Sequence, residues 1–198
     1  MKKILLLITI VLFNYTFSQE NKVKTFRFNP KISLGFHTQN FIGDNYLAKG
    51  HSNPAIGIET DFQIFSFKKI NTGFGIKRVG LNVTDKSIGG NIDRTNINSI
   101  HVFLSYDLLK INKFNIIPEV QFGGLELRQK GDGNSYGVQN GNFYNFSVNI
   151  NYKINKYLHP YFKIGFDSYL LKTNTTDEFK SYFNRSNSLN LSLGIQFL

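Results

Sequence analysis

The stretch SLNLSLGIQFL, from Ser188 to Leu198, decides the fold of this 198-residue chain. Apolar side chains occupy every second position from Leu189 to Phe197, and small or polar residues stand between them. Successive side chains of a β-strand point to opposite faces of the sheet. The stretch therefore predicts a strand with one apolar and one polar face.

The same two-residue period recurs along the chain, in segments separated by turn-forming residues. The third segment changes phase: its apolar residues occupy even-numbered positions at Phe74 and Ile76 but odd-numbered positions at Val79 and Leu81. A β-bulge around Lys77–Arg78 would explain this change, since one extra residue reverses the facing of all that follow. The eight segments are residues 26–37, 56–64, 72–83, 99–108, 114–123, 144–154, 158–167 and 188–198.

The connections between the segments alternate in length. Short turns are expected near Phe67–Ile70, Leu109–Lys113 and Asn155–Tyr157. Long polar loops are expected at Thr38–Asn53, Thr84–Arg94, Arg128–Asn142 and Leu171–Asn187. Short periplasmic turns and longer external loops are typical of outer-membrane barrels. The sequence predicts an all-β fold, an eight-stranded antiparallel transmembrane β-barrel with up-and-down meander order.

The first 18 residues have the pattern of a secretion signal. Lys2–Lys3 precedes the apolar run Ile4–Phe13, and small residues stand at the −3 and −1 positions of a cut after Ser18. The run is shorter than the ~20 residues that a membrane-spanning helix needs. We expect a signal peptide at 1–18, a barrel domain at 19–198 and a location in the cell outer membrane.

Composition excludes several classes of function. The chain has no cysteine, which excludes disulfides, thiolate metal sites and a lipoprotein anchor. Its formal net charge is +10, but the lysines and arginines form no clustered patch, so nucleic-acid binding is not expected. A secreted lipocalin-like barrel, with its apolar face turned inward around a ligand, would show the same periodicity and stays open.

The chain resembles the small eight-stranded outer-membrane barrels of the OmpA/OmpX type, and more specifically the PorT-like outer membrane protein β-barrel domain group of Gram-negative bacteria. The resemblance covers roughly Lys24 to Leu198 and rests on the secretion signal, the alternation, the segment IIPEVQFG at 116–123 and the terminal strand. From the residues we expect a structural or surface-interaction role through the first, third and fourth long loops, with a closed interior and no open pore. The PorT-like resemblance implies the alternative, a component of a protein-secretion apparatus.

Ten charged residues fall on the predicted inward face, five basic and five acidic. Isolated charges inside a narrow barrel are costly to desolvate, so we expect them to pair and hold the barrel shut. An ion- or proton-conducting path is the alternative, although the interior of an eight-stranded barrel is just filled by side chains. The expected network comprises Arg27, Lys31, Glu59, Asp61, Lys77, Asp107, Glu119, Lys153, Lys163 and Asp167.

His101, Ser105 and Asp107 share the inward face of one predicted strand and suggest a catalytic triad. Four residues along a strand span ~13 Å, which is too far for His101 to activate Ser105 directly. A lipid A-modifying enzyme would need a partner from another strand. We therefore predict no enzyme activity, no cofactor and no metal site.

Expected partners follow from the loops, the turns and the last strand. The last long loop carries aromatic and basic residues that suit a protein surface, namely Phe179, Lys180, Tyr182, Phe183 and Arg185. The short turns hold lysines that suit lipid phosphates, namely Lys68, Lys69, Lys110, Lys113 and Lys156. We expect contact with outer-membrane lipids and lipopolysaccharide, with the barrel-assembly machinery through Ser188 to Leu198, and with an unknown surface or periplasmic protein.

Overall fold

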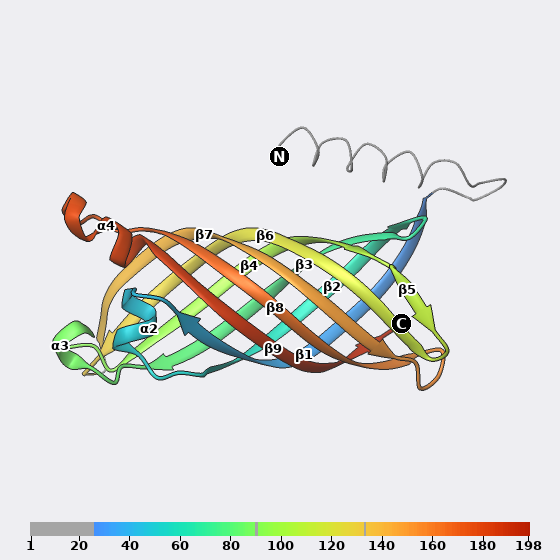
Figure 1. The fold of residues 1–198 in the computed structure, drawn as a ribbon, viewed down its shortest axis with the longest axis horizontal. Helices are drawn as coiled ribbons and strands as arrows, with labels where there is room; N and C mark the ends of the chain where they lie inside the picture. Colours follow the sequence, from blue (N-terminus) through green and yellow to red (C-terminus); the bar gives the residue numbers. More distant parts are fainter. Residues whose placement is uncertain (1–25, 90, 133) are drawn as a thin grey trace.

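A computed structural model describes residues 26–198 apart from residues 90 and 133, and the expected signal peptide lies outside these residues. The described chain folds into a closed antiparallel β-barrel (Figure 1). None of the described helices is long and apolar enough to cross a membrane. The strands are β1 (Arg27–Ile42), β2 (Ala55–Phe67), β3 (Ile70–Asn82), β4 (Arg94–Tyr106), β5 (Leu109–Ile111), β6 (Phe114–Gly131), β7 (Asn134–Tyr152), β8 (Leu158–Lys172) and β9 (Arg185–Phe197). The helices are α2 (Tyr46–Gly50), α3 (Lys86–Gly89) and α4 (Asp177–Asn184).

The strands follow one another round the barrel in chain order. Each long strand pairs with its neighbour, and β9 pairs with β1. β4 pairs directly with β6, and the three-residue β5 pairs with the start of β6 beyond the end of β4. Eight long strands thus close the wall and leave no edge for further pairing. The predicted eight-stranded meander is confirmed.

The two ends of the barrel differ. The end that we call the turn end carries the short connections, at residues 68–69, 112–113 and 153–157. The other end, which we call the loop end, carries α2, α3 and α4 (Figure 1). The turn at 68–69 is as short as predicted, whereas most of the turn predicted at Leu109–Lys113 pairs with β6 as β5.

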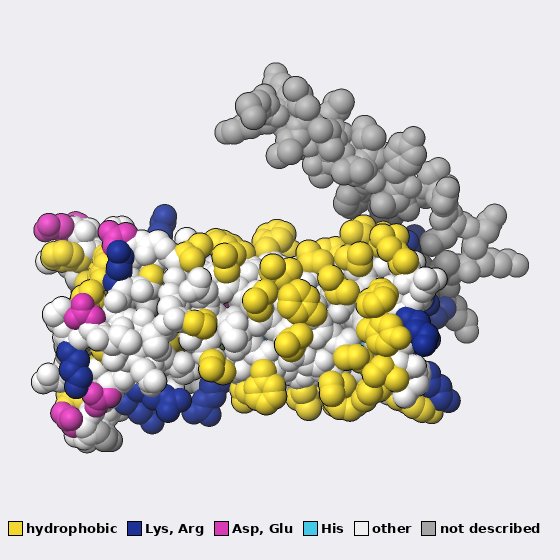
Figure 2. All heavy atoms as spheres, turned by 60° about the horizontal axis from the view of Figure 1, so that its bottom comes forward, with side chains coloured by type: hydrophobic (Ala, Val, Ile, Leu, Met, Phe, Trp, Pro, Cys, Tyr) yellow, Lys and Arg dark blue, Asp and Glu magenta, His cyan; other side chains and the backbone are white. Residues whose placement is uncertain are grey.

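Over most of its length the barrel is apolar outside and polar inside. In β9, Leu193 is 64% exposed on the outer face, whereas its neighbour Ser192 is 1% exposed inside. Figure 2 shows the outer apolar side chains as a broad belt that stops short of the loop end. Soluble monomeric proteins rarely expose a continuous apolar surface of this extent. The lipocalin-like alternative required the opposite facing and is wrong for this part of the barrel.

Toward the loop end the facing of apolar side chains reverses. In β3, Ile76 points outward, but Val79 and Leu81 point inward and are almost fully buried. The pairing of β3 with both neighbours runs unbroken through Lys77 and Arg78, so the predicted β-bulge there is wrong. The change of phase in the sequence has another cause: the outer face of the strand changes from apolar to polar along its length, while the backbone stays regular.

One predicted long loop is also absent. Residues Arg128–Asn142 form the end of a hairpin, in which β6 and β7 stay paired from Phe114↔Tyr152 to Gly131↔Asn134. The polar composition of this segment reflects strands whose outer face lies beyond the apolar belt. The other three long connections contain α2, α3 and α4.

Candidate functional site: the barrel interior and its mouth

A buried lysine gathers three carboxylates at the centre of the barrel. The Nζ atom of Lys163, on β8, lies 3.1 Å from Asp61 Oδ2, 3.2 Å from Glu59 Oε1 and 3.3 Å from Glu119 Oε1. Lys163 is 1% exposed. Because β2, β6 and β8 all contribute, these pairs tie together strands that do not neighbour one another in the wall. The O–H of Tyr161 donates a further hydrogen bond of 3.0 Å to Glu59.

A second lysine joins this group to a fourth carboxylate. Lys77 Nζ lies 4.0 Å from Glu59 Oε2 and 3.9 Å from Asp167 Oδ1. Asp167 is fully buried, and it accepts side-chain amide hydrogen bonds of 2.7 Å. Asp167 is the carboxylate that lies farthest from the two lysines, and amide groups donate the hydrogen bonds that its buried charge requires. The donors are Gln39, Asn145 and Asn190.

The histidine of the suggested triad belongs to the same cluster. His101 Nε2 lies 2.8 Å from Asp61 Oδ1 on β2. Asp107 stands exposed at the turn end, where it accepts a hydrogen bond from Asn71. The side-chain partner of His101 is thus a carboxylate on β2, and not the serine on its own strand that a catalytic triad would require.

Six of the ten predicted network residues meet in this cluster, and four do not. Arg27, the first residue of β1, and Lys153, which follows the last residue of β7, are exposed at the turn end. Lys31 and Asp107 line a small polar cavity of about 30 Å³ between the cluster and the turn end. The cavity has room for about two waters and no larger ligand. The six that meet, which we call the charged cluster, are Glu59, Asp61, Lys77, Glu119, Lys163 and Asp167.

Two aromatic rings separate the charged cluster from the loop end. Phe143 packs edge-on against His101, and Lys77 Nζ lies 5.7 Å from the centre of its ring. Tyr169 stacks on the other side of Phe143 and packs against Phe41. The rings mark the change from the charged cluster to an interior that is mainly apolar.

An apolar core fills the loop end of the barrel. Helix α2 lies across the mouth and buries Tyr46 and Leu47 in this core. Asn45 starts the helix, because its Oδ1 accepts hydrogen bonds from the Ala48 N–H and from the Ser186 hydroxyl. We call the following set the apolar cap: Phe41, Tyr46, Leu47, Ala55, Val79, Leu81, Ile97, Leu125, Leu127, Phe143, Tyr169 and Leu171.

His51 directly follows α2 and packs against the apolar cap. Its Nε2 lies 2.7 Å from the Thr95 hydroxyl, and its ring meets the Tyr46 ring edge to face. Burial lowers the pKa of His51 below its ordinary value, since a charged imidazole would lose its water here. The cap therefore favours a neutral His51.

The predicted interaction surface on the last loop divides between two environments. Tyr182 and Phe183 pack against the apolar cap, and the Phe183 ring lies 5.3 Å from that of Tyr46. Phe179 is 49% exposed, and Lys180 forms an ion pair with Asp177 on the outer side of α4. Arg185 is exposed at the start of β9. Two of the five predicted residues thus serve as a lid, and three face outward.

The interior offers no site for a metal ion among the described residues, since no three histidine or acidic side chains there are arranged to hold one. Sequence reasoning found the charged residues but missed the amides that complete their hydrogen bonding. Gln39, Asn145 and Asn190 also occupy inward positions of the alternation, which was the available signal.

Comparisons with known proteins agree on the fold. No family model and no curated protein matches the sequence. Among solved structures, Neisserial surface protein A is similar with a TM-score of 0.61 and 9% identity, over 85% of this chain and 96% of that one. The outer membrane protein AlkL, solved in lipid bilayers, is similar with a TM-score of 0.52 and 14% identity, over 91% and 94%.

At such identities the likeness establishes the fold alone. The shared fold is a small closed antiparallel β-barrel. The finer resemblance to the PorT-like group stays a prediction.

Proposed function

We propose that the chain is an outer-membrane barrel whose apolar belt lies in the bilayer and whose loop end projects outside the cell. The observation that carries this proposal is the reversal of facing along the strands. Apolar side chains cover the outside only as far as Ile76 on β3, and they turn inward from Val79 onward. Lipid would cover the first part and water the second, as each surface requires.

The interior is closed at two levels, so the proposed role does not include a pore. The charged cluster fills the middle of the barrel, and the apolar cap with α2 fills the mouth. Purified protein in a planar bilayer should give no steady conductance. Ohmic channels that persist in the wild type would reject the closed barrel.

A structural or surface-interaction role then rests on the loop end. Apolar side chains remain exposed on its outside, where neither lipid nor the cap covers them. Phe179 on α4 and Tyr136 and Val138 on the β6–β7 hairpin are each about half exposed. Exposed aromatic residues beyond the belt suit contact with a surface partner. A photo-crosslinker at Phe179 should capture a partner in living cells, whereas one at the lid residue Phe183 should not.

The orientation is tested by protease access. A cleavable tag inserted between Asp132 and Asn134, at the tip of the β6–β7 hairpin, should be cut on intact cells. A tag inserted between Lys68 and Lys69, at the turn end, should be protected until the outer membrane is opened. The reverse pattern would place the turn end outside the cell.

A further inference from the structure

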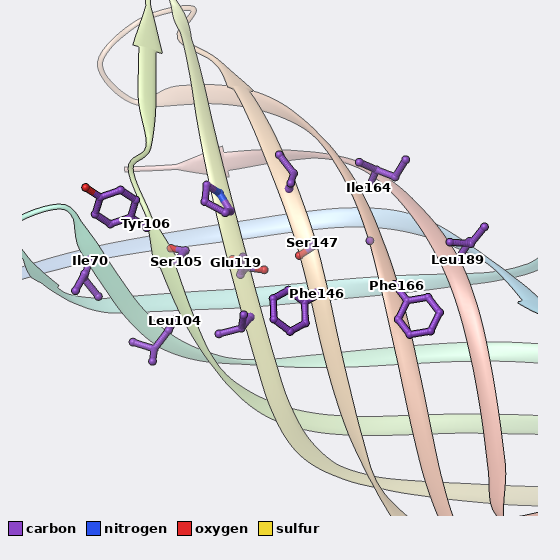
Figure 3. A pocket seen from close by; sticks show the side chains of 14 residues that line it. Ile70, Leu104, Ser105, Tyr106, Glu119, Phe146, Ser147, Ile164, Phe166 and Leu189 are labelled. Atoms are coloured by element: carbon purple, nitrogen blue, oxygen red, sulfur yellow. The ribbon is translucent and has the colours of Figure 1, made fainter. Parts of the chain in front are cut away.

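Two neighbouring rows of side chains on the apolar belt leave a groove between them (Figure 3). One row, which we call the phenylalanine row, follows the strand pairing from β4 to β9. It consists of Leu104, Val120, Phe146, Phe166 and Leu189. The other row, which we call the proline row, lies two residues nearer the turn end and consists of Ile70, Tyr106, Pro118, Val148 and Ile164.

The floor of the groove is backbone. Ser105, Glu119, Ser147 and Gly165 lie between the two rows, and those that have side chains direct them into the barrel. With walls of aliphatic and aromatic side chains on both sides, the groove has a volume of about 660 Å³. Its lining is apolar except at the floor.

The dimensions of the groove fit one hydrocarbon chain. Adjacent outward rows on any strand are ~7 Å apart, so the room for a single chain comes from the short side chains of Pro118 and Val148 in the proline row. The phenylalanine row crosses four strand-to-strand spacings of ~4.8 Å, or ~19 Å in all. An acyl chain of one leaflet has to span about half of a ~30 Å hydrocarbon core. The groove is therefore long enough to hold most of one chain.

One end of the groove carries a positive charge. Ile70 and Tyr106 form this end, at the edge of the belt, and Lys69 stands directly beyond them. The Nζ atom of Lys69 lies 6.0 Å from the centre of the Tyr106 ring, and its carbonyl oxygen accepts a hydrogen bond from the Asp107 N–H. The backbone hydrogen bond holds the turn, and the ammonium group lies beside Tyr106, where a chain in the groove would reach the membrane surface.

We infer that this groove is a specific binding site for a phospholipid of the inner leaflet, with an acyl chain between the two rows and the phosphate on Lys69. The inference rests on the proposed function, because it requires the belt to lie in the bilayer. The positive end selects a phosphate-bearing lipid over a second copy of this chain, whose own belt is apolar. Ordinary belt surface would hold lipids without preference, whereas this groove holds one by its shape and its charged end.

A second groove strengthens the choice of a two-chain lipid. It runs along the other side of the phenylalanine row, with a volume of about 380 Å³, and is lined on its far side by Val102, Phe122 and Tyr144. The two grooves are parallel and separated only by the side chains of Leu104, Val120 and Phe146. Two acyl chains joined at one headgroup could lie on either side of this ridge.

Native mass spectrometry of the full barrel in detergent, titrated with palmitoyl-oleoyl phosphatidylethanolamine, tests the site. The wild type should retain one lipid under activation that removes all others, and diacylglycerol with the same chains should bind more weakly. Val148→Phe should fill the groove and weaken retention severalfold. Its control is Ile58→Phe, which also places a phenyl ring on the belt but away from both rows. Lys69→Gln should weaken binding about five-fold, whereas Lys156→Gln on another turn should not.

Equal retention by Val148→Phe and Ile58→Phe would overturn the site. So would a dimer of the wild type that Val148→Phe disrupts, because the groove would then hold a second copy. Every variant should still run faster unheated than boiled on a detergent gel and fractionate with the outer membrane. A wild type that fails those two assays would contradict the proposed function itself and not merely the lipid site.

Discussion

On β3, Ile76 points out of the barrel and Lys77 points in, whereas three residues later Val79 points in and its neighbour Arg78 points out. The same strand thus builds two regions of opposite polarity. The region toward the turn end has an apolar outside and the charged cluster inside. The region toward the loop end has a polar outside and the apolar cap inside.

The two regions hold the barrel together by different forces. Where lipid covers the outside, moving an apolar residue from wall to interior gains little, so the interior can hold ion pairs and amides. Beyond the belt, water surrounds the barrel and the hydrophobic effect again drives apolar side chains inward. Substitutions that probe one region should therefore have different consequences from those that probe the other.

The largest effect is expected from the charged cluster. Lys163→Met leaves Glu59, Asp61 and Glu119 without their shared cation and should cost about 3–5 kcal/mol of unfolding free energy. Urea titration of the barrel in lipid vesicles measures it. Lys172→Met, at an exposed position on the same strand, is the control and should change little. A Lys163→Met barrel as stable as the wild type would mean that water solvates the three carboxylates.

A cavity in the apolar cap should weaken the loop end selectively. Leu127 is fully buried there, and Leu127→Ala should cost about 3 kcal/mol. The loss should appear as faster proteolysis within the cap and α4, while the gel mobility of the unheated barrel stays unchanged. If the belt region unfolded together with the cap, the two regions would form one cooperative unit, against the comparison drawn above.

The outer surfaces should respond to charge in opposite ways. Phe146 and Asn142 both point outward on β7, four residues apart, one in the belt and one beyond it. Phe146→Arg should destabilise the barrel in vesicles by about 2–4 kcal/mol, because the guanidinium enters hydrocarbon. Asn142→Arg should stay within about 0.5 kcal/mol. If both substitutions lowered the unfolding free energy equally, the edge of the apolar belt would not lie between Asn142 and Phe146.

The smallest effect concerns pH at the cap. Burial lowers the pKa of His51 in the folded state, while the unfolded chain keeps a value near 6.5. The unfolded state therefore takes up the proton first, and the stability that His51 contributes is complete above pH ~6.5 and decreases as the pH falls below it. Chemical denaturation between pH 7.5 and 5 should show this decrease in the wild type and less of it in His51→Gln. If stability decreased equally in the wild type and in His51→Gln, the decrease would come from other titratable groups.

Much of this arrangement could be read from the sequence, and the failures have a common cause. Alternation placed Glu59, Asp61, Glu119 and Lys163 inward because strand geometry alone fixes facing. It could not tell whether the change of phase after Ile76 marked a bulge or a change of solvent, since both give the same letters. Only the register of neighbouring strands separates the two.

Two of the five predicted loop residues lie elsewhere than expected, for a related reason. Tyr182 and Phe183 look like exposed aromatics in a polar segment, and nothing local shows that an apolar cap lies below them. The cap is assembled from seven strands and a helix, so its existence depends on long-range pairing. The charges at Arg27 and Lys153 were similarly placed by period alone, which does not show that the first residue of β1 and the residue after β7 are exposed at the turn end.

The boundary between the two regions can be measured directly, because the chain has no native cysteine. Asn140→Cys and Phe146→Cys place single thiols on the outer face of β7, ~20 Å apart along the strand. On intact cells, a membrane-impermeant maleimide should label Asn140→Cys rapidly, and Phe146→Cys only after detergent unfolding. Equal labelling of both thiols on the folded protein would show that water covers the belt, and it would contradict the account of a barrel that crosses the membrane with one region and stands outside it with the other.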